Sequence, residues 1–413
     1  MIQTVSLGFT GLDIQDIKLP CHVQLSVSLP LTLCRLADCK LTEVSYQAVA
    51  SALQSLVSLT ELDLTNNDLK ESGVKLLSAG LSSPHCKLKT LRLNQCRLSK
   101  ESCKMMASVL RGTPSHLREL DMGDNDLQDE GVNLLFVGLR DPQCKLETLR
   151  LSQCRLSKES CKMMASVLRG TPSHLRELDM GDNDLQDEGV NLLSVGLRDP
   201  QCKLETLRLK GFIDHVVNRD LSMRECRLSK ESCKMMASVL RGTPSHLREL
   251  DMGDNDLQDE GMNLLCVGLK DPQCKLETLR LKGCKLTHES CKVGSSFLNS
   301  TNYLLELDLS HNVLRDSGVQ LLSKGLSSPH CKLQTLRLAD CKLTEVTYKA
   351  VASALQSIVS LTELDLTNND LKDSGVQLLS AGLRLGDRMW SDETKIKLFG
   401  INSTCRVWMG KEC

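Results

Sequence analysis

Two kinds of sequence repeat alternate along most of this chain, and their fixed spacing constrains the fold more than any other feature. One kind carries the pattern LRLxxCxL, and the other carries LxELDLxxNDLxDxGVxLLxxGLxxPxCKL. Apart from one insertion, successive repeats begin 28 or 29 residues apart. The first kind begins at Leu31, Leu88, Leu146, Leu204, Leu276 and Leu333, and the second kind at Leu59, Leu117, Leu175, Leu247, Leu304 and Leu361. This period is typical of an array in which each repeat packs on its neighbours and does not fold alone.

Each repeat of the first kind predicts a short strand followed by a helix. In the repeat that begins at Leu88, Leu91 and Leu93 set the strand period, and Ser99 is placed to cap a helix. The inner face of that helix is expected to carry Cys103, Met106 and Leu110. The cysteines of this repeat recur in columns along the array, which indicates packing in the core.

The second kind of repeat is expected to fold in the same way. Leu120 and Met122 belong to its strand, Asn125 to a buried turn, and Asp129 to the helix cap, with Val132 on the core side. A side-chain amide at the turn can satisfy backbone groups that would otherwise be buried without partners. We therefore interpret the asparagine column as structural. It comprises Asn67, Asn125, Asn183, Asn255, Asn312 and Asn369.

Strands on one side of the array and wider helices on the other should make the stack curve. The predicted fold class is α/β: a leucine-rich solenoid, or horseshoe, with parallel strands on the concave face and helices on the convex face. We expect an irregular leader at residues 1–30, about twelve repeats at 31–383 with an insertion at 212–225, and an atypical, disordered tail at 384–413.

Composition argues against several classes of function. The net charge is -1, with 51 basic and 52 acidic residues, so no long-range field attracts nucleic acid or an anionic membrane. No run of 18 apolar residues occurs, which predicts no membrane span. The cysteine columns lack the paired spacing of a zinc site, and reduced thiols fit a cytoplasmic protein. The histidines recur with the repeats, so we expect no catalytic residues, no metal and no cofactor.

The concave face or the loops that ascend from it are the predicted place of function, through binding of a protein. Its outward positions hold arginine in the first kind of repeat and aspartate in the second, with glutamate two residues before each aspartate. Each arginine should stand between two aspartates and form a ladder that is largely neutralised internally. Two alternatives remain, a solvated self-paired face and a selective binding face. For binding, the candidate residues are Arg92, Asp121, Arg150, Asp179, Arg208 and Asp251.

The repeat lengths, the cysteine and asparagine columns, and the junction LxxPxCKLxTLRL resemble the ribonuclease-inhibitor type of leucine-rich repeat. More closely, they resemble the C-terminal repeats of NOD-like receptors with a NACHT nucleotide-binding domain. The resemblance covers residues 31–383 and implies the ligand-sensing or autoinhibitory region of an intracellular innate immune receptor. The chain contains no GxxxxGK[ST] phosphate loop, so it carries no NACHT switch of its own. The alternative is a ribonuclease-inhibitor-like protein, ranked lower because the arginine column dilutes the acidic field that would attract a basic nuclease.

Irregular features favour a further alternative, a non-functional fragment of a duplicated receptor gene. Residues 93–148 return almost unchanged as residues 151–206, which indicates recent duplication. Residues 212–225 interrupt one repeat after its strand. Residues 389–413 include WSDETK and resemble a remnant of a mariner-type transposase, in which the residue matching Asp392 binds metal. No transposase activity is expected, because the flanking carboxylates of such a site are missing.

Overall fold

The computed structural model describes most of the repeat array. The described residues are 5–6, 32–55, 58–112, 115–169, 173–211, 226, 228–242, 245–300, 303–347, 351, 360–370 and 395–397. The chain divides into two compact units, Met1–Leu204 and Glu205–Cys413. We call them the N-terminal unit and the C-terminal unit, and each is described by itself.

In the N-terminal unit, short strands alternate with helices. In chain order they are β1 (Val5–Ser6), β2 (Leu33–Arg35), α1 (Glu43–Ser55), β3 (Glu61–Asp63), α2 (Lys70–Leu81), β4 (Thr90–Arg92), α3 (Lys100–Arg111), β5 (Glu119–Asp121), α4 (Gln128–Leu139), β6 (Thr148–Arg150), α5 (Lys158–Leu168), β7 (Glu177–Asp179) and α6 (Gln186–Leu197). Strands β1 to β7 pair in order and in parallel.

The C-terminal unit repeats this arrangement. Its elements are β8 (Thr206–Arg208), α7 (Lys230–Leu240), β9 (Glu249–Asp251), α8 (Gln258–Leu269), β10 (Thr278–Arg280), α9 (His288–Leu298), β11 (Glu306–Asp308), α10 (Arg315–Leu326), β12 (Thr335–Arg337), β13 (Glu363–Asp365) and β14 (Lys395–Lys397). Strands β8 to β14 also pair in order and in parallel.

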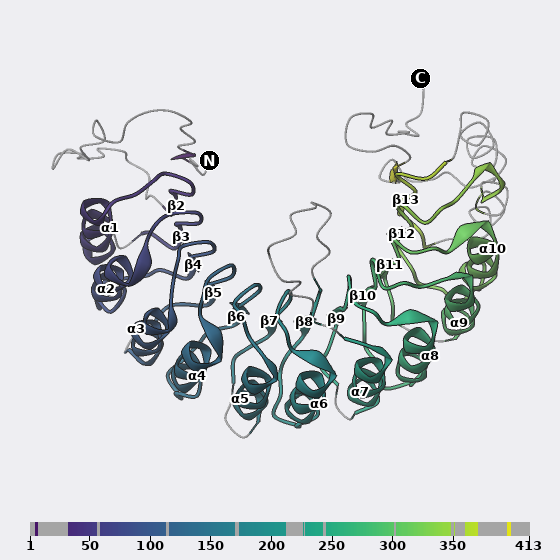
Figure 1. The fold of residues 1–413 in the computed structure, drawn as a ribbon, viewed down its shortest axis with the longest axis horizontal. Coiled ribbons are helices and arrows are strands. Elements are labelled where there is room, and N and C mark those ends of the chain that lie inside the picture. Colours follow the sequence, from purple (N-terminus) through teal and green to yellow (C-terminus); the bar gives the residue numbers. More distant parts are fainter. Residues whose placement is uncertain are drawn as a thin grey trace. The chain divides into compact units, whose positions relative to one another are not determined.

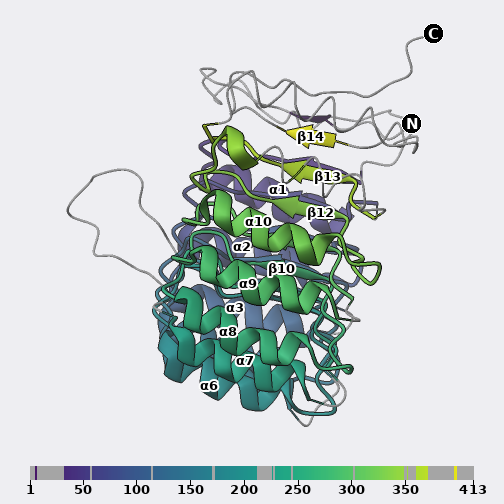
Figure 2. The same ribbon diagram turned by 90° about the vertical axis from the view of Figure 1, so that its right-hand side faces the viewer.

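Strands line one side of each unit and helices line the other, as Figure 1 shows. Figure 2 shows helices α7 to α10 stacked side by side on the outer side of the C-terminal unit. Because packed helices lie farther apart than paired strands, neighbouring repeats are closer on the strand side. The predicted fold class, an open α/β solenoid of parallel strands and helices, is confirmed.

The predicted core residues are buried. The middle residue of each strand from β3 to β13 is buried, and Leu91, Leu120 and Leu149 are completely buried. The cysteines follow the same rule, since Cys96 and Cys103 have no exposed surface. The thiol of Cys96 donates to the Leu64 carbonyl at 3.2 Å, so this column satisfies backbone groups as well as filling space.

The asparagine column has the structural role that the sequence predicted. The Asn125 Oδ1 accepts hydrogen bonds from the backbone amides of Cys96, at 3.0 Å, and Leu98, at 2.9 Å. Its Nδ2 donates to the carbonyls of Leu93 and Met122, both at 2.9 Å. One side chain therefore joins the turns of two neighbouring repeats, and Asn183 makes the same contacts one pair of repeats later.

A glycine column lets the helices of each repeat pair approach closely. A Cβ atom added to Gly138 of α4 would lie 2.8 Å from the Ala107 carbonyl oxygen and 2.9 Å from the Ala107 Cα of α3. Gly80 meets Ala50 and Gly196 meets Ala165 in the same way. These positions accept only glycine because the neighbouring backbone occupies the space of a side chain.

Helix capping differs from the prediction at Asp129. The residue before α4 is Leu127, which is itself helical and makes no side-chain cap. Asp129 lies in the first turn of α4 and accepts hydrogen bonds from the backbone N and the hydroxyl of Ser157, at 2.9 and 2.5 Å. The prediction that Asp129 caps its own helix is therefore wrong, because the carboxylate reaches the helix of the next repeat. Ser99 does stand at the N-cap of α3, but its hydroxyl contacts Glu71.

Several predicted segments lie outside the described residues. These are the insertion at 212–225, nearly all of the leader at 1–30, and the tail at 384–413 except β14. Asp392 and the transposase resemblance belong to this group.

Candidate protein-binding surface

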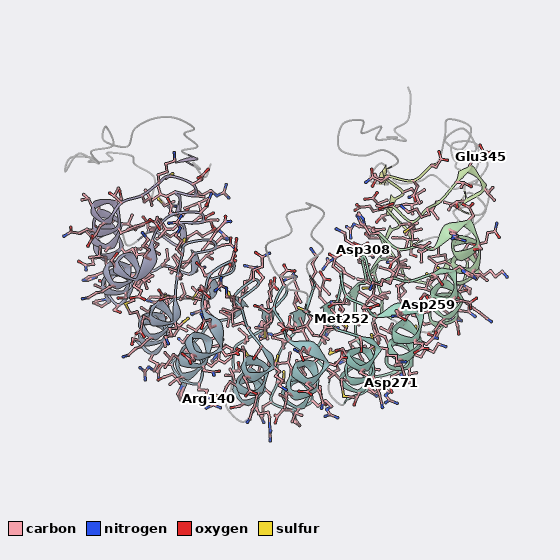
Figure 3. The ribbon with its side chains drawn as sticks, viewed as in Figure 1. Arg140, Met252, Asp259, Asp271, Asp308 and Glu345 are labelled. Carbon is pink, nitrogen blue, oxygen red and sulfur yellow. The ribbon has the colours of Figure 1, made fainter. Side chains whose placement is uncertain are left out.

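The outward side chains of the strands form a regular surface in each unit, which we call the strand face. In the N-terminal unit, the strand face consists of Glu61, Asp63, Thr90, Arg92, Glu119, Asp121, Thr148, Arg150, Glu177 and Asp179. In the C-terminal unit, it consists of Thr206, Arg208, Glu249, Asp251, Thr278, Arg280, Glu306, Asp308, Thr335, Arg337, Glu363 and Asp365. Figure 3 places Asp308 on the strand side of its unit, whereas Asp271 lies on the helical side.

The register across the strands is the one predicted from the sequence. Arg92 is opposite Asp121, Asp121 is opposite Arg150, and Arg150 is opposite Asp179. In the C-terminal unit, Arg208 is opposite Asp251. All six candidate residues therefore lie on strand faces, four of them in the N-terminal unit and two in the C-terminal unit.

The side chains form ion pairs that the sequence prediction did not contain, because the arginines contact glutamates. Arg92 Nη2 lies 3.5 Å from Glu119 Oε1. Arg150 contacts the same carboxylate through Nη1 and reaches Glu177 Oε1 at 3.0 Å through Nη2. Each of these glutamates lies diagonally across the pleat from its arginine. The expected ladder of arginine and aspartate is thus a ladder of arginine and glutamate.

The C-terminal unit carries the same ladder. Arg208 Nη2 lies 2.9 Å from Glu249 Oε1. Arg280 contacts Glu249 as well, and its Nη2 lies 3.1 Å from Glu306 Oε1. Arg337 then contacts Glu306 and lies 3.9 Å from Glu363 Oε1. The repetition in both units shows that the pairing follows from the repeat sequence.

The strand-face aspartates accept hydrogen bonds from the backbone, whereas the glutamates pair with arginines. Asp121 Oδ1 accepts a hydrogen bond from the Gly123 amide at 3.0 Å, and Asp251 Oδ1 accepts one from Gly253 at 2.9 Å. The aspartate side chain is shorter than that of glutamate and turns back to the backbone amide two residues later. Such an Asx turn is common for aspartate at the end of a strand. The predicted alternation of arginine and aspartate across the strands is therefore confirmed, but the ion pairs of the arginines are made with glutamates.

The two carboxylates on one strand are shifted in opposite directions. Burial raises the pKa of Asp121, and the Gly123 amide offsets this only in part, so the net pKa lies above its usual range. Burial would also raise the pKa of Glu119, but hydrogen bonding and charge from Arg150 lower it further, so its net pKa lies below the usual range. Glu119 therefore stays ionised beside its arginines.

Carboxylates outnumber guanidinium groups on both strand faces. From β3 to β7 there are six carboxylates and two arginines, a formal charge of -4. From β8 to β13 there are six carboxylates and three arginines, a formal charge of -3. The outermost strands add cations in register, because Arg35 of β2 is opposite Asp63 and Lys395 and Lys397 of β14 are opposite Glu363 and Asp365. The excess of carboxylates therefore belongs to strands β3 to β7 and β8 to β13.

The glutamates are the residues that the predicted site omitted. Glu119, Glu177, Glu249 and Glu306 hold the arginines, and each side chain is only 20–22% exposed. Their place two residues before the aspartates was a usable signal, because residues two apart share one side of a strand. Side-chain length decides which carboxylate reaches an arginine on the next strand.

Within the described residues, the structure holds no group of three or more histidine, cysteine, aspartate or glutamate side chains arranged to bind a metal. None of the described helices is long and apolar enough to cross a membrane.

Comparison with known proteins agrees with this architecture. The Leucine Rich repeat family matches at residues 55–78, 113–136, 171–194, 243–266, 301–323 and 359–380, which are the repeats of the second kind. Ribonuclease inhibitor of Sus scrofa is 38% identical over 423 residues, covering 90% of this chain and 92% of that protein. NACHT, LRR and PYD domains-containing protein 12 of Homo sapiens is 44% identical over 331 residues, covering 80% of this chain but 30% of that protein.

Among solved structures, a chain of the crystal structure of the Rad7 and Elc1 complex in yeast is 20% identical, with a TM-score of 0.43. The similarity covers 83% of this protein and 81% of that chain. Alternating strands and helices with this period define a leucine-rich-repeat protein, a class that serves as a scaffold for protein binding. Its similarity to ribonuclease inhibitor runs over nearly the whole length of both proteins. The chain belongs to the ribonuclease inhibitor family.

Proposed function

We propose that this protein is a non-enzymatic binding protein whose strand faces bind a partner protein with a basic surface. The observation that carries this proposal is the excess of carboxylates on the strand faces. Their backbone is held by the parallel sheet, and the glutamates are held by arginines, so the acidic groups are ordered before a partner arrives. Preorganised charge of this kind lowers the cost of association and speeds encounter.

A basic ribonuclease is the first partner to test. The relatives that this chain matches over most of their length are named ribonuclease inhibitors, and a cytoplasmic setting suits its many thiols. The arginine column does not cancel the acidic field, since each arginine is already paired with glutamate and the aspartates remain in excess. This argument reverses the ranking that the arginine column alone suggested.

Calorimetric titration with a pancreatic-type ribonuclease, together with an RNA-hydrolysis assay, tests the proposal. The variant Glu119→Gln/Glu177→Gln removes two carboxylates from the N-terminal strand face. We expect its affinity to fall by roughly tenfold or more. The matched control is Glu130→Gln/Glu188→Gln, which removes two carboxylates from helices α4 and α6, where they pair with Lys100 and Lys158. Equal affinities for both variants and the native chain would disprove binding through the strand face.

A second candidate is the ligand-sensing or autoinhibitory part of an innate immune NOD-like receptor. It is supported by the 44% identity to the human NACHT-containing relative, of which this chain spans 30%. Full-length transcripts of the locus provide the test. A transcript that joins these repeats in frame to an upstream NACHT-coding exon supports the receptor function. A transcript that carries the 413-residue frame alone supports the free binding protein.

A further inference from the structure

A second charged surface lies at the edge of the N-terminal unit where the strands begin. Backbone hydrogen bonds join the residues just before the strands in series, from the Arg118 amide to the Lys89 carbonyl at 2.7 Å, from Glu147 to Arg118 at 2.7 Å, and from Arg176 to Glu147 at 2.8 Å. Two residues earlier, a second column alternates lysine and histidine. The amino edge consists of Lys87, Lys89, His116, Arg118, Lys145, Glu147, His174, Arg176 and Lys203.

Positive charge accumulates around His116 on this edge. The Lys87 Nζ lies 3.3 Å from the His116 Nε2 and donates to it. Burial lowers the pKa of His116, and the charges of Lys87, Arg118, Lys145 and Lys89 lower it further. Four cationic side chains of the amino edge therefore lie close enough to His116 to lower its pKa, which indicates a positive electrostatic potential at this edge.

Much of this charge has no internal partner. Arg118 pairs with Glu147 at 3.4 Å. In the part of the chain that the structure describes, no carboxylate lies within ion-pair distance of Lys87, Lys89 or Lys145. The matching position in the C-terminal unit differs, since the Lys332 ammonium lies over the Tyr303 ring at 5.0 Å from its centroid.

Part of the preference for basic residues at this edge has a simple cause. The helices run antiparallel to the strands, so their C-terminal ends lie at this edge, and the helix dipole favours cations there. That effect acts within the last turn of a helix. Lys87, Lys89 and Lys145 lie beyond the helices, in the segments that lead into the strands. The helix dipole therefore does not account for the lysines nearest to the strand face.

We propose that the amino edge binds an acidic, extended segment of a partner protein. Adjacent strands are about 4.8 Å apart, so Lys87 and Lys145, two strands apart, are separated by about 10 Å along the edge. A peptide extended in the polyproline II conformation rises about 3.1 Å per residue with about three residues per turn, so every third side chain recurs on the same side at about 9 Å. Carboxylates with that spacing can face Lys87 and Lys145 together.

A nucleic acid fits this edge less well. Glu119 directly follows Arg118, so the acidic strand face begins within one residue of the basic edge. Duplex DNA carries one charge per about 1.7 Å of its axis, and such a dense polyanion would also meet these carboxylates. Base stacking needs exposed aromatic rings. The described aromatic residues of the N-terminal unit, Tyr46 and Phe136, are buried.

Fluorescence anisotropy with the whole chain tests the proposal. The probe is a labelled peptide of about ten residues with glutamate at every third position, and its glutamine counterpart serves as the control probe. We expect the glutamate peptide to bind and to weaken as salt screens the charges. The variant Lys87→Gln/Lys145→Gln should lower the affinity roughly five- to tenfold. The matched control is Lys104→Gln/Lys162→Gln, which removes two exposed lysines from helices α3 and α5.

The outcomes separate this surface from the strand face. Equal affinity of the native chain and Lys87→Gln/Lys145→Gln, or an equal loss in the helix control, would overturn the proposal. Tighter binding of single-stranded DNA than of the peptide would overturn the choice of an acidic protein segment. Glu119→Gln/Glu177→Gln should leave peptide binding intact, even though it weakens the basic partner, so either proposal can fail without the other.

Discussion

Replacement of Asn125 by alanine should show how much one buried amide contributes to the array. The side chain is 5% exposed and bridges two repeats. Its loss leaves the Cys96 and Leu98 amides without the Oδ1 acceptor, and it leaves the Leu93 carbonyl without the Nδ2 donor. The Met122 carbonyl keeps a second donor, the Cys154 thiol at 3.2 Å. The Gly123 carbonyl also accepts from Nδ2 but keeps the Gln95 amide at 3.0 Å, so three of the five groups are left without a hydrogen-bond partner.

The magnitude follows from those three groups. A buried donor or acceptor without a partner costs about 1–3 kcal/mol, so the loss of three partners should lower the free energy of unfolding of Asn125→Ala by roughly 3–9 kcal/mol. That is a large share of the stability of a typical domain, about 5–15 kcal/mol. Urea unfolding followed by circular dichroism measures the loss. Hydrogen exchange should locate it at the amides of Cys96 and Leu98.

The control for this prediction is another asparagine in the same unit. Asn191 is exposed on helix α6, and Asn191→Ala should change the free energy of unfolding by less than about 0.5 kcal/mol. A loss below about 1 kcal/mol for Asn125→Ala, with unchanged exchange at Cys96 and Leu98, would refute the argument that the amide satisfies these turns. Asn183→Ala provides a repeat of the experiment in an equivalent environment.

Three further predictions rest on the same repeats. Burial raises the pKa of Asp259, but hydrogen bonds from Ser290 and Thr287 outweigh it, so the net pKa is low. The ionised Asp259 contributes fully to the free energy of unfolding above the pKa of an aspartate in the unfolded chain, and this contribution is lost as the pH falls through the lower pKa of the folded state. In acid titrations below about pH 4, the stability of Asp259→Asn should therefore fall less steeply with pH than that of the native protein. Gly138→Ala should destabilise the fold by roughly 1–3 kcal/mol, because its Cβ would meet Ala107. Gly294→Ala should be neutral or stabilising, because its Cβ would have contacts no closer than 3.4 Å. Equal midpoints of urea unfolding for the two glycine variants would refute this contrast. Burial raises the pKa of Cys103 to about 12, so mass spectrometry after thiol labelling at neutral pH should find it protected and the partly exposed Cys39 modified. Rapid labelling of Cys103 in the folded protein would contradict that assignment.

The sequence was sufficient for the fold because every repeat obeys the same pattern. Strand, turn and helix positions recur at 28 or 29 residues, so one repeat predicts the burial of all equivalent residues. The errors concern side-chain reach. Asp129 caps the neighbouring helix, and Asp121 turns back to Gly123, because contacts between repeats depend on distances that a linear pattern does not contain.

The candidate site was predictable as a surface but not as a set of contacts. Arg150 and Asp121 are in register as expected, yet the longer Glu119 side chain is the one that reaches the guanidinium. Lys87 and Lys145 recur as the lysine of the CKL pattern, 58 positions apart, but the pattern does not show that they lie on the edge of the sheet. Only the strand pairing brings them to one edge.

Duplication of a 58-residue block has a different consequence for each proposed surface. Residues 93–148 and 151–206 carry the same strand residues and the same edge residues, so each copy adds carboxylates to the strand face and cations to the amino edge. A compact basic partner has a fixed footprint and gains nothing once that footprint is filled. An extended acidic segment contacts every added repeat, and linked contacts strengthen one another through their effective concentration. We therefore expect the addition of near-identical repeats to change the affinity of the amino edge for its partner more than the affinity of the strand face.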